Sequence, residues 1–233
     1  MSAGPYASLD FALLRDPDAL RENQARLGAS VGFEPERLYQ ATQVHGATVL
    51  VASGDRRVME KSEADALVAE PGSGNAVAVR VADCVPVLLA DPVTGRVAAV
   101  HAGWKGIEAK VIEAAALVLE RGSEPGRWLA AIGPCIGACC FEVGTDVADR
   151  IVRASSRAVV ASTLDDKVYI DLRRAARGQL IDLGVPNDAI DDVPSADMRV
   201  GCTRCDAARF YSYRRDADAS GRLMGVIVAG AGA

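Results

Sequence analysis

Two histidines and one cysteine are the residues of this chain best suited to bind a metal ion: His45, Cys84 and His101. Each lies at the end of a predicted strand or in a turn, where side chains from different strands can meet in a cleft. Two neutral imidazoles and a thiolate suit Zn²⁺ with a fourth position left for water or substrate, as in catalytic zinc sites. The same three ligands also suit a single copper ion. Their separations of 39 and 17 residues match no short zinc motif, so spacing alone does not establish the site.

The same three residues also allow interpretations without a catalytic metal. Cys84 could act as a nucleophilic thiolate activated by His45 or His101, as in a thiol hydrolase. A structural zinc that only braces strands would require a fourth protein ligand. A cysteine in an apolar strand is also commonly a small buried side chain, and a histidine beside glycine is often a hydrogen-bonded turn residue. Metal analysis separates the hydrolase from the zinc enzyme, because zinc at Cys84 leaves no free thiolate.

Two further segments carry groups that suit a phosphate or a carboxylate. A turn with the sequence Gly103-Trp-Lys-Gly106 leads into a predicted helix that begins near Gly106. Backbone N–H groups and the positive end of the helix dipole favour an anion there, beside Lys105 on the same turn. The segment 210–216 adds aromatic side chains and two arginines, of which Arg214 is the candidate phosphate ligand. The alternative for this segment is an exposed strand edge with solvated arginines.

The remaining cysteines form two groups, Cys135-x3-Cys139-Cys140 and Cys202-x2-Cys205. Together they contain enough thiols for a second zinc site. However, this spacing is not a standard pair of zinc knuckles, and neighbouring cysteines on a strand would point to opposite faces. We therefore expect buried thiols at these positions.

The composition is that of an ordinary globular protein, with 50% hydrophobic and 24% charged residues among 233. The net charge of −5 offers no basic surface for a nucleic acid or an anionic membrane. Neither a signal peptide nor an apolar stretch long enough to span a membrane is found, so we expect a cytoplasmic protein with reduced cysteines. A trinuclear copper cluster needs many imidazoles, and two histidines are too few for one in a monomer. The oligomeric state is not predicted.

Hydrophobic periodicity predicts an α+β fold in a single domain over residues 1–233, in which hairpins and helices alternate. A helix capped by Asp16 and Pro17 should end at Gly28 or Gly32. Strands are predicted at 47–52, 66–68, 76–81, 85–90, 96–101, 128–132, 169–170 and 222–229, and the tight connection at 91–95 predicts a hairpin. Further helices are predicted from Ile107 to Gly122, over 146–154, and from a cap at Asp171 to Gly184.

Together these segments resemble the YfiH family, also called the laccase-domain or polyphenol-oxidase-like family and related to human FAMIN. The resemblance covers almost the whole chain and rests on many blocks in the same order. These are Gln43-Val-His-Gly46, Ala64-Asp-Ala-Leu67, Ala82-Asp-Cys-Val-Pro-Val-Leu-Leu-Ala-Asp91, Val100-His-Ala-Gly-Trp-Lys-Gly106, Ile132-Gly-Pro-Cys-Ile-Gly137, Cys140-Phe-Glu-Val-Gly144, Cys202-Thr203, Tyr211-Ser-Tyr-Arg-Arg-Asp216 and Gly221-Arg222. The resemblance implies a layered sandwich in which helices cover a central mixed β core.

The resemblance also implies an activity and a metal. It implies zinc on His45, Cys84 and His101, with phosphorolysis of inosine, adenosine and methylthioadenosine. Adenosine deamination is a further implied activity, in which Asp83 would carry a proton. An editing role on peptidoglycan precursors is also attached to some members, and the laccase label would require copper. The chain departs from the family near its start, where Asp10 replaces an asparagine and the segment around Leu14 lacks a family histidine.

Overall fold

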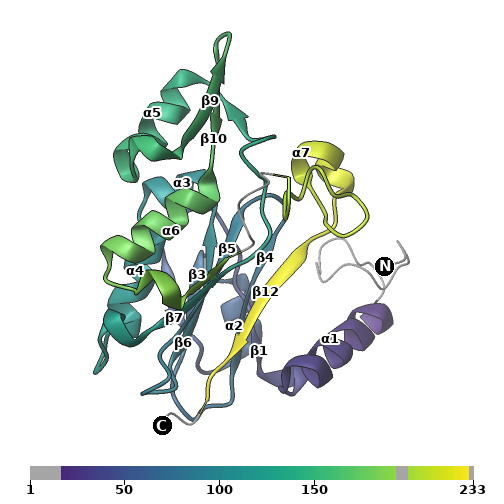
Figure 1. The fold of residues 1–233 in the computed structure, drawn as a ribbon. Coiled ribbons are helices and arrows are strands. Elements are labelled where there is room, and N and C mark those ends of the chain that lie inside the picture. Colours follow the sequence, from purple (N-terminus) through teal and green to yellow (C-terminus); the bar gives the residue numbers. More distant parts are fainter. Residues whose placement is uncertain (1–16, 193–198, 231–233) are drawn as a thin grey trace.

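The computed structural model describes residues 17–192 and 199–230 (Figure 1). The positions Asp10 and Leu14 and the expected helix cap Asp16 lie outside the described residues. The helices are α1 (Pro17–Val31), α2 (Arg56–Lys61), α3 (Trp104–Glu108), α4 (Val111–Leu119), α5 (Thr145–Ala154), α6 (Leu172–Asp182) and α7 (Tyr213–Asp216). The strands are β1 (Leu38–Tyr39), β2 (Val49–Val51), β3 (Ala66–Ala69), β4 (Ala76–Val81), β5 (Val85–Ala90), β6 (Val97–Ala102), β7 (Leu129–Ile132), β8 (Glu142–Val143), β9 (Val160–Leu164), β10 (Lys167–Ile170), β11 (Ile190–Asp192) and β12 (Leu223–Val228).

Within the described residues, the centre of the molecule is a mixed sheet of six strands in the order β11-β7-β5-β6-β3-β2. Its inner pairs are antiparallel, whereas β2 on β3 and β11 on β7 are parallel. The strands β3 and β6 are buried along their whole length, as expected for a sheet covered on both faces. The predicted hairpin is confirmed, because β5 and β6 pair antiparallel across the turn after Asp91.

A smaller sheet, β1-β4-β12, packs against one face of the central sheet. Alanine and valine side chains from both sheets, such as Val77, Val79 and Ala99, form the core between them. Helix α1 lies on the outer face of the small sheet (Figure 1), where Leu27 contacts the cluster around Phe33. The helix continues through Gly28 and ends at Val31, just before Gly32, whose φ of +92° glycine adopts readily.

Helices α3, α4 and α6 cover the opposite face of the central sheet (Figure 1). The buried face of α4 carries Val111 and Ala115, as the helical periodicity predicts. The single helix expected from Ile107 onward is nevertheless wrong, because Lys110 adopts φ +61° and divides the segment into α3 and α4. The α+β architecture with a mixed β core between helices is confirmed.

A third sheet, β8-β10-β9, lies beside α5 at one end of the molecule (Figure 1). The sequence predicts only a short strand at 169–170 here, and it overlooks β8 and β9. Most of β9 is exposed and has no alternation of buried and exposed side chains, so it lacks the usual strand signal. Asp171 caps α6 by accepting a hydrogen bond from the Arg174 N–H, as expected.

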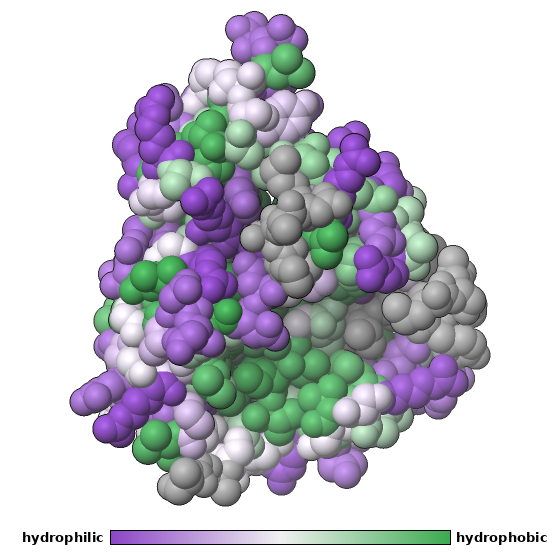
Figure 2. Space-filling model, in the orientation of Figure 1, coloured by the Kyte–Doolittle hydropathy of each residue, from purple (hydrophilic) through white to green (hydrophobic). Residues whose placement is uncertain are grey.

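An apolar groove of about 500 Å³ lies between strands of the central sheet and β12 of the small sheet, and its lining includes Leu88, Ile132 and Met224. Figure 2 shows apolar side chains gathered on the lower half of the face in view. Among the helices of the described residues, none is both long and apolar enough to cross a membrane.

The two leucines of α4 provide a matched test of the core. Leu119 is completely buried, whereas Leu117 is 65% exposed on the same helix. We expect Leu119→Ala to lower the free energy of unfolding by about 2–5 kcal/mol, because it leaves a cavity. Leu117→Ala should change it by less than about 0.5 kcal/mol. Urea denaturation of the two variants measures both values, and equal losses would contradict the assignment of this core.

Candidate metal and substrate site

The buried carboxylate of Asp65 organises the loop that carries His45. The backbone N–H groups of Val44, His45 and Gly46 all donate to Asp65, over 3.2, 2.9 and 2.7 Å. They hold His45 at φ +62°, a left-handed conformation that is unfavourable for histidine without such support. Asp65 itself is completely buried at the start of β3. The loop conformation therefore depends on this one side chain.

The same carboxylate also orients His101 at the end of β6. The Nδ1–H of His101 donates to Asp65 Oδ1 over 2.8 Å, which leaves Nε2 directed toward the cleft. A carboxylate behind the imidazole is the usual partner of a metal-binding histidine. Burial opposes a charge on His101, but the Cys84 thiolate and Asp65 outweigh it and raise the pKa of His101 to about 9. Burial alone would raise the pKa of Asp65, yet His101 and the loop N–H groups lower it below its ordinary value.

Cys84 completes a compact set of ligand atoms. Its Sγ lies 3.8 Å from His45 Nε2, and the candidate ligand atoms of Cys84 and the two histidines lie within 4.8 Å of one another. Burial opposes ionisation of the thiol, but His101 and His45 lower the pKa of Cys84 to about 6. A Cβ atom at Gly103 would lie only 2.9 Å from Cys84 Sγ, so glycine is needed for this approach.

These distances fit one metal ion bound by His45, Cys84 and His101. Zinc bonds of about 2.0–2.3 Å place tetrahedral ligand atoms roughly 3.3–3.8 Å apart, close to the separation of Cys84 Sγ and His45 Nε2. Three protein ligands leave one coordination position open, which is typical of catalytic rather than structural zinc. The structure therefore brings together the three residues that the sequence analysis selected.

The three candidate ligands lie in the wall of a cavity of about 590 Å³. The cavity wall also contains the cationic residues Arg80, Arg214 and Arg222 and the aromatic residues Phe141 and Tyr213. The guanidinium of Arg214 lies 5.6 Å from the Phe141 ring centre. Cations beside aromatic faces suit a ligand that combines an anionic group with a flat ring.

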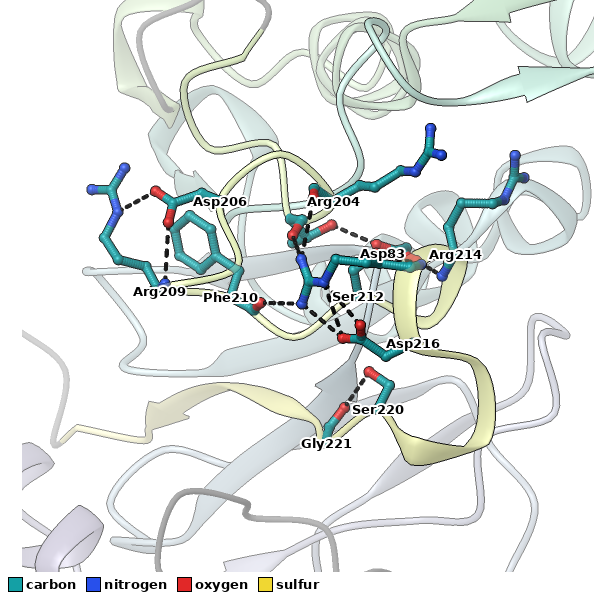
Figure 3. A network of polar contacts seen from close by, with 12 residues as sticks. Asp83, Arg204, Asp206, Arg209, Phe210, Ser212, Arg214, Asp216, Ser220 and Gly221 are labelled. Atoms are coloured by element: carbon teal, nitrogen blue, oxygen red, sulfur yellow. Dashed lines mark hydrogen bonds and ion pairs between the residues drawn. The ribbon is translucent and has the colours of Figure 1, made fainter. Parts of the chain in front are cut away.

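Asp83 lies in the cavity wall and anchors the segment that carries Arg214 (Figure 3). Its Oδ1 accepts a hydrogen bond from the Thr203 hydroxyl, and its Oδ2 accepts one from the Arg214 backbone N–H, both over 2.6 Å. Ser212 caps the short helix α7 that follows, so the exposed strand edge considered for this segment is wrong. Asp83 thus positions Arg214 at the cavity.

The turn expected to bind phosphate lies outside the residues that line this cavity. A Cβ atom at Gly103 would approach the candidate ligands Cys84 and His45 to 2.9 and 3.1 Å, and one at Gly106 would approach the His101 carbonyl oxygen to 3.2 Å. Lys105 is exposed and lies 5.7 Å from the Trp104 ring centre. The close packing at both glycines accounts for their presence without a phosphate, and the phosphate role of this turn stays a prediction.

The sequence analysis gave no role to Asp65, Arg80 or Arg222. Asp65 and Arg222 lie in sequence segments that resemble the family, and this resemblance was the one available indication that they could matter. The contacts of Asp65 could not be foreseen, because a single acidic residue beside an apolar strand gives no indication of the loop that it binds. Arg80 reaches the cavity from the end of β4, where its backbone pairs with the Gln43 side chain.

Replacing Asp65 tests its control of the metal ligands. We expect Asp65→Asn to lower zinc affinity about 10–100-fold, because the amide lacks the charge that orients His101. Asp91→Asn is the matched control, since Asp91 is an equally buried aspartate that holds the β5–β6 turn. Competition with a chromophoric chelator measures both affinities. Unchanged zinc affinity in folded Asp65→Asn would contradict this role.

Comparisons with known proteins identify the family of this chain. The family model described as multi-copper polyphenol oxidoreductase laccase matches residues 1–230. A purine nucleoside phosphorylase of Streptomyces coelicolor is 39% identical, and the match covers 97% of this chain and 90% of the relative. An adenosine deaminase of an unknown prokaryotic organism is 36% identical, over 94% of this chain and 86% of the relative.

The solved structures agree with the described fold. The crystal structure of YlmD from Geobacillus stearothermophilus has a TM-score of 0.83 and 28% sequence identity, over 98% of this chain and 87% of that one. The resemblance to the YfiH and laccase-domain proteins is thereby confirmed. The chain belongs to the family of enzymes described as multi-copper polyphenol oxidoreductase laccases.

Proposed function

We propose that this chain is a zinc-dependent purine nucleoside phosphorylase that acts on inosine, adenosine and methylthioadenosine. The observation that carries the proposal is one cavity whose wall contains the three clustered residues His45, Cys84 and His101 together with Arg214. A nucleoside and a phosphate together need a flat apolar surface, an anion site and a means of orienting oxygen atoms. The relative in Streptomyces coelicolor, named a purine nucleoside phosphorylase, supports the proposal.

The proposed metal is zinc, held by His45, Cys84 and His101. When bound there, zinc supplies a positive charge that polarises or orients an oxygen atom of the substrate. A single copper ion would suit the same ligands, but the multi-copper chemistry in the family description would require more imidazoles. The whole chain has only two histidines, and both belong to this one site.

The protein groups of the cavity suit phosphorolysis. The guanidinium of Arg214 binds phosphate, while the rings of Phe141 and Tyr213 contact the purine. A phosphate oxygen attacks the anomeric carbon as the bond from that carbon to the purine nitrogen breaks. The bonding electrons leave with the purine, which takes up a proton, and ribose 1-phosphate forms. By holding both reactants, the cavity makes the attack effectively unimolecular.

Adenosine deamination is the second candidate activity, favoured by the relative named adenosine deaminase. In this reaction water displaces ammonia at the purine C6 and requires a group that transfers a proton. Both carboxylate oxygens of Asp83 accept hydrogen bonds from Thr203 and Arg214, so proton transfer by Asp83 would disturb the cavity wall. We therefore assign Asp83 to positioning and place phosphorolysis first.

Incubation with nucleosides tests the primary proposal. Zinc-replete protein is mixed with inosine or adenosine, with and without phosphate, and the products are separated by chromatography. We expect hypoxanthine or adenine only when phosphate is present, and at least a 100-fold loss of rate in Cys84→Ala, roughly the effect of losing one essential catalytic group. Conversion of adenosine to inosine in the same assay would reveal deamination.

Cys135→Ala provides the matched control, because Cys135 is buried outside the cavity wall and should leave the rate unchanged. Absence of base release from zinc-replete protein would overturn the phosphorylase. A thiolate hydrolase acting on amides of cell-wall precursors would then be the next candidate, since Cys84 Sγ lies near His45 Nε2.

Replacing Arg214 tests the proposed phosphate site. We expect Arg214→Gln to raise the KM for phosphate about 10–100-fold, because a charge-assisted hydrogen bond of roughly 1.5–3 kcal/mol is lost. The KM for inosine should change much less. Arg209→Gln is the control, since Arg209 is exposed on the same segment and pairs with Asp206 away from the cavity. A rise confined to the KM for inosine would contradict the assignment.

A further inference from the structure

Four cysteines expected to be buried thiols come together at one point of the structure: Cys139, Cys140, Cys202 and Cys205. The expectation is wrong for two of them, because Cys139 is half-buried and Cys205 is exposed. The expectation assumed that Cys139 and Cys140 lie on a strand and point apart. They lie instead in a turn, in which the Cys140 N–H donates to the Gly137 carbonyl over 2.9 Å. In a turn, unlike in a strand, neighbouring side chains can point to the same side, so Cys139 and Cys140 can both contribute to one metal site.

The second pair of cysteines reaches this turn through a backbone bridge. Cys135 pairs with Cys202, and the Thr203 N–H donates to the Cys135 carbonyl over 3.0 Å. The four residues thus come from two segments that are separated by about sixty positions in the sequence. The Gly137 N–H donates to Cys202 Sγ over 3.2 Å, which is the kind of contact that stabilises a thiolate ligand.

The distances between the sulfur atoms suit a single ion. Cys205 Sγ lies 3.4 Å from Cys140 Sγ and 3.7 Å from Cys139 Sγ, and all four sulfur atoms lie within 4.8 Å of one another. Zinc–sulfur bonds of about 2.3 Å place the corners of a tetrahedron roughly 3.8 Å apart. A disulfide would use only two of the four thiols and would leave the others unexplained.

We propose that Cys139, Cys140, Cys202 and Cys205 bind one structural zinc ion. Four thiolates close the coordination shell, so this ion has no position for substrate and differs in kind from the metal of the cavity. The sulfur atoms are too close together to enclose a cluster of several iron atoms, which leaves a single tetrahedral ion such as zinc. The assignment does not depend on the proposed phosphorylase activity.

The ion would fasten two parts of the cavity wall to each other. The turn of Cys140 continues into Phe141, and the segment of Cys202 continues through Thr203 to Arg214. The Arg215 guanidinium already ties this segment together by donating to the Thr203 carbonyl over 2.8 Å. The zinc would therefore hold the chain that places Arg214, without touching the substrate itself.

Zinc counting on the whole protein tests the assignment. Native mass spectrometry and elemental analysis are applied to the wild type, Cys205→Ala, Cys84→Ala and Cys135→Ala. We expect two zinc ions per chain in the wild type and one in either Cys205→Ala or Cys84→Ala, because each variant removes a ligand of a different site. Cys135→Ala is the matched control and should keep two, since its thiol belongs to neither ligand group.

The outcomes separate the two sites. One zinc in the wild type that is lost in Cys84→Ala but kept in Cys205→Ala would overturn the cysteine site and leave the cavity metal intact. A disulfide between Cys205 and Cys139 or Cys140 in the unreduced protein would overturn it as well. One zinc that is lost only in Cys205→Ala would support the cysteine site while contradicting the cavity metal.

A second measurement covers the case in which Cys205→Ala does not fold. Cobalt exchanged into the wild type should give the intense sulfur-to-metal charge-transfer absorption of a tetrathiolate site, and Cys84→Ala should retain most of it. Removal of zinc by a chelator should also speed trypsin cleavage after the exposed Arg204 and Arg209. Cobalt absorption that disappears entirely in Cys84→Ala would overturn the proposal.

Discussion

The buried carboxylate of Asp65 is the contact on which the candidate site depends. It accepts three backbone N–H groups from the loop of His45 and one imidazole N–H from His101, so it joins two segments that are distant in the sequence. A buried charge is tolerated only when its hydrogen bonds are satisfied, and here the partners belong to the two segments that carry the candidate ligands His45 and His101. The hydrogen bonds that satisfy the Asp65 carboxylate therefore also fix the positions of both histidines.

The strand pairing supplies the third candidate ligand. In the β5–β6 hairpin Pro86 lies opposite His101 and Val85 lies opposite Ala102, which puts Cys84 directly beside the end of β6. The buried faces of both strands fix this register, and the tight turn at 91–95 closes the hairpin. Gly103 then allows the approach of the Cys84 sulfur. The hairpin and the loop held by Asp65 thus bring His45, Cys84 and His101 together in the wall of the cavity.

The parts of the fold that follow regular patterns could be predicted from the sequence, including β3, β4, β12 and the β5–β6 hairpin, whereas the short strands β1 and β11 were not predicted. The break between α3 and α4 could not be predicted. Lys110 adopts a left-handed backbone conformation there, without the glycine or proline that usually marks such a break. Likewise His45, Cys84 and His101 could be selected by residue type, whereas the roles of Asp65 and Asp83 arise from contacts made only in three dimensions. The turn that brings Cys139 and Cys140 to one side could not be predicted from the sequence either.

The carboxylate of Asp65 positions both histidines and the β5–β6 hairpin positions Cys84, so that these three side chains can bind the one metal ion that we propose for the cavity. Diffraction from crystals of the zinc-loaded protein, measured on both sides of the zinc absorption edge, tests this arrangement. We expect an anomalous peak within bonding distance of His45 Nε2, Cys84 Sγ and His101 Nε2, with the His101 Nδ1–H still donating a hydrogen bond to Asp65. A map without density at this position, or with the metal bound through His101 Nδ1 in place of Asp65, would contradict it.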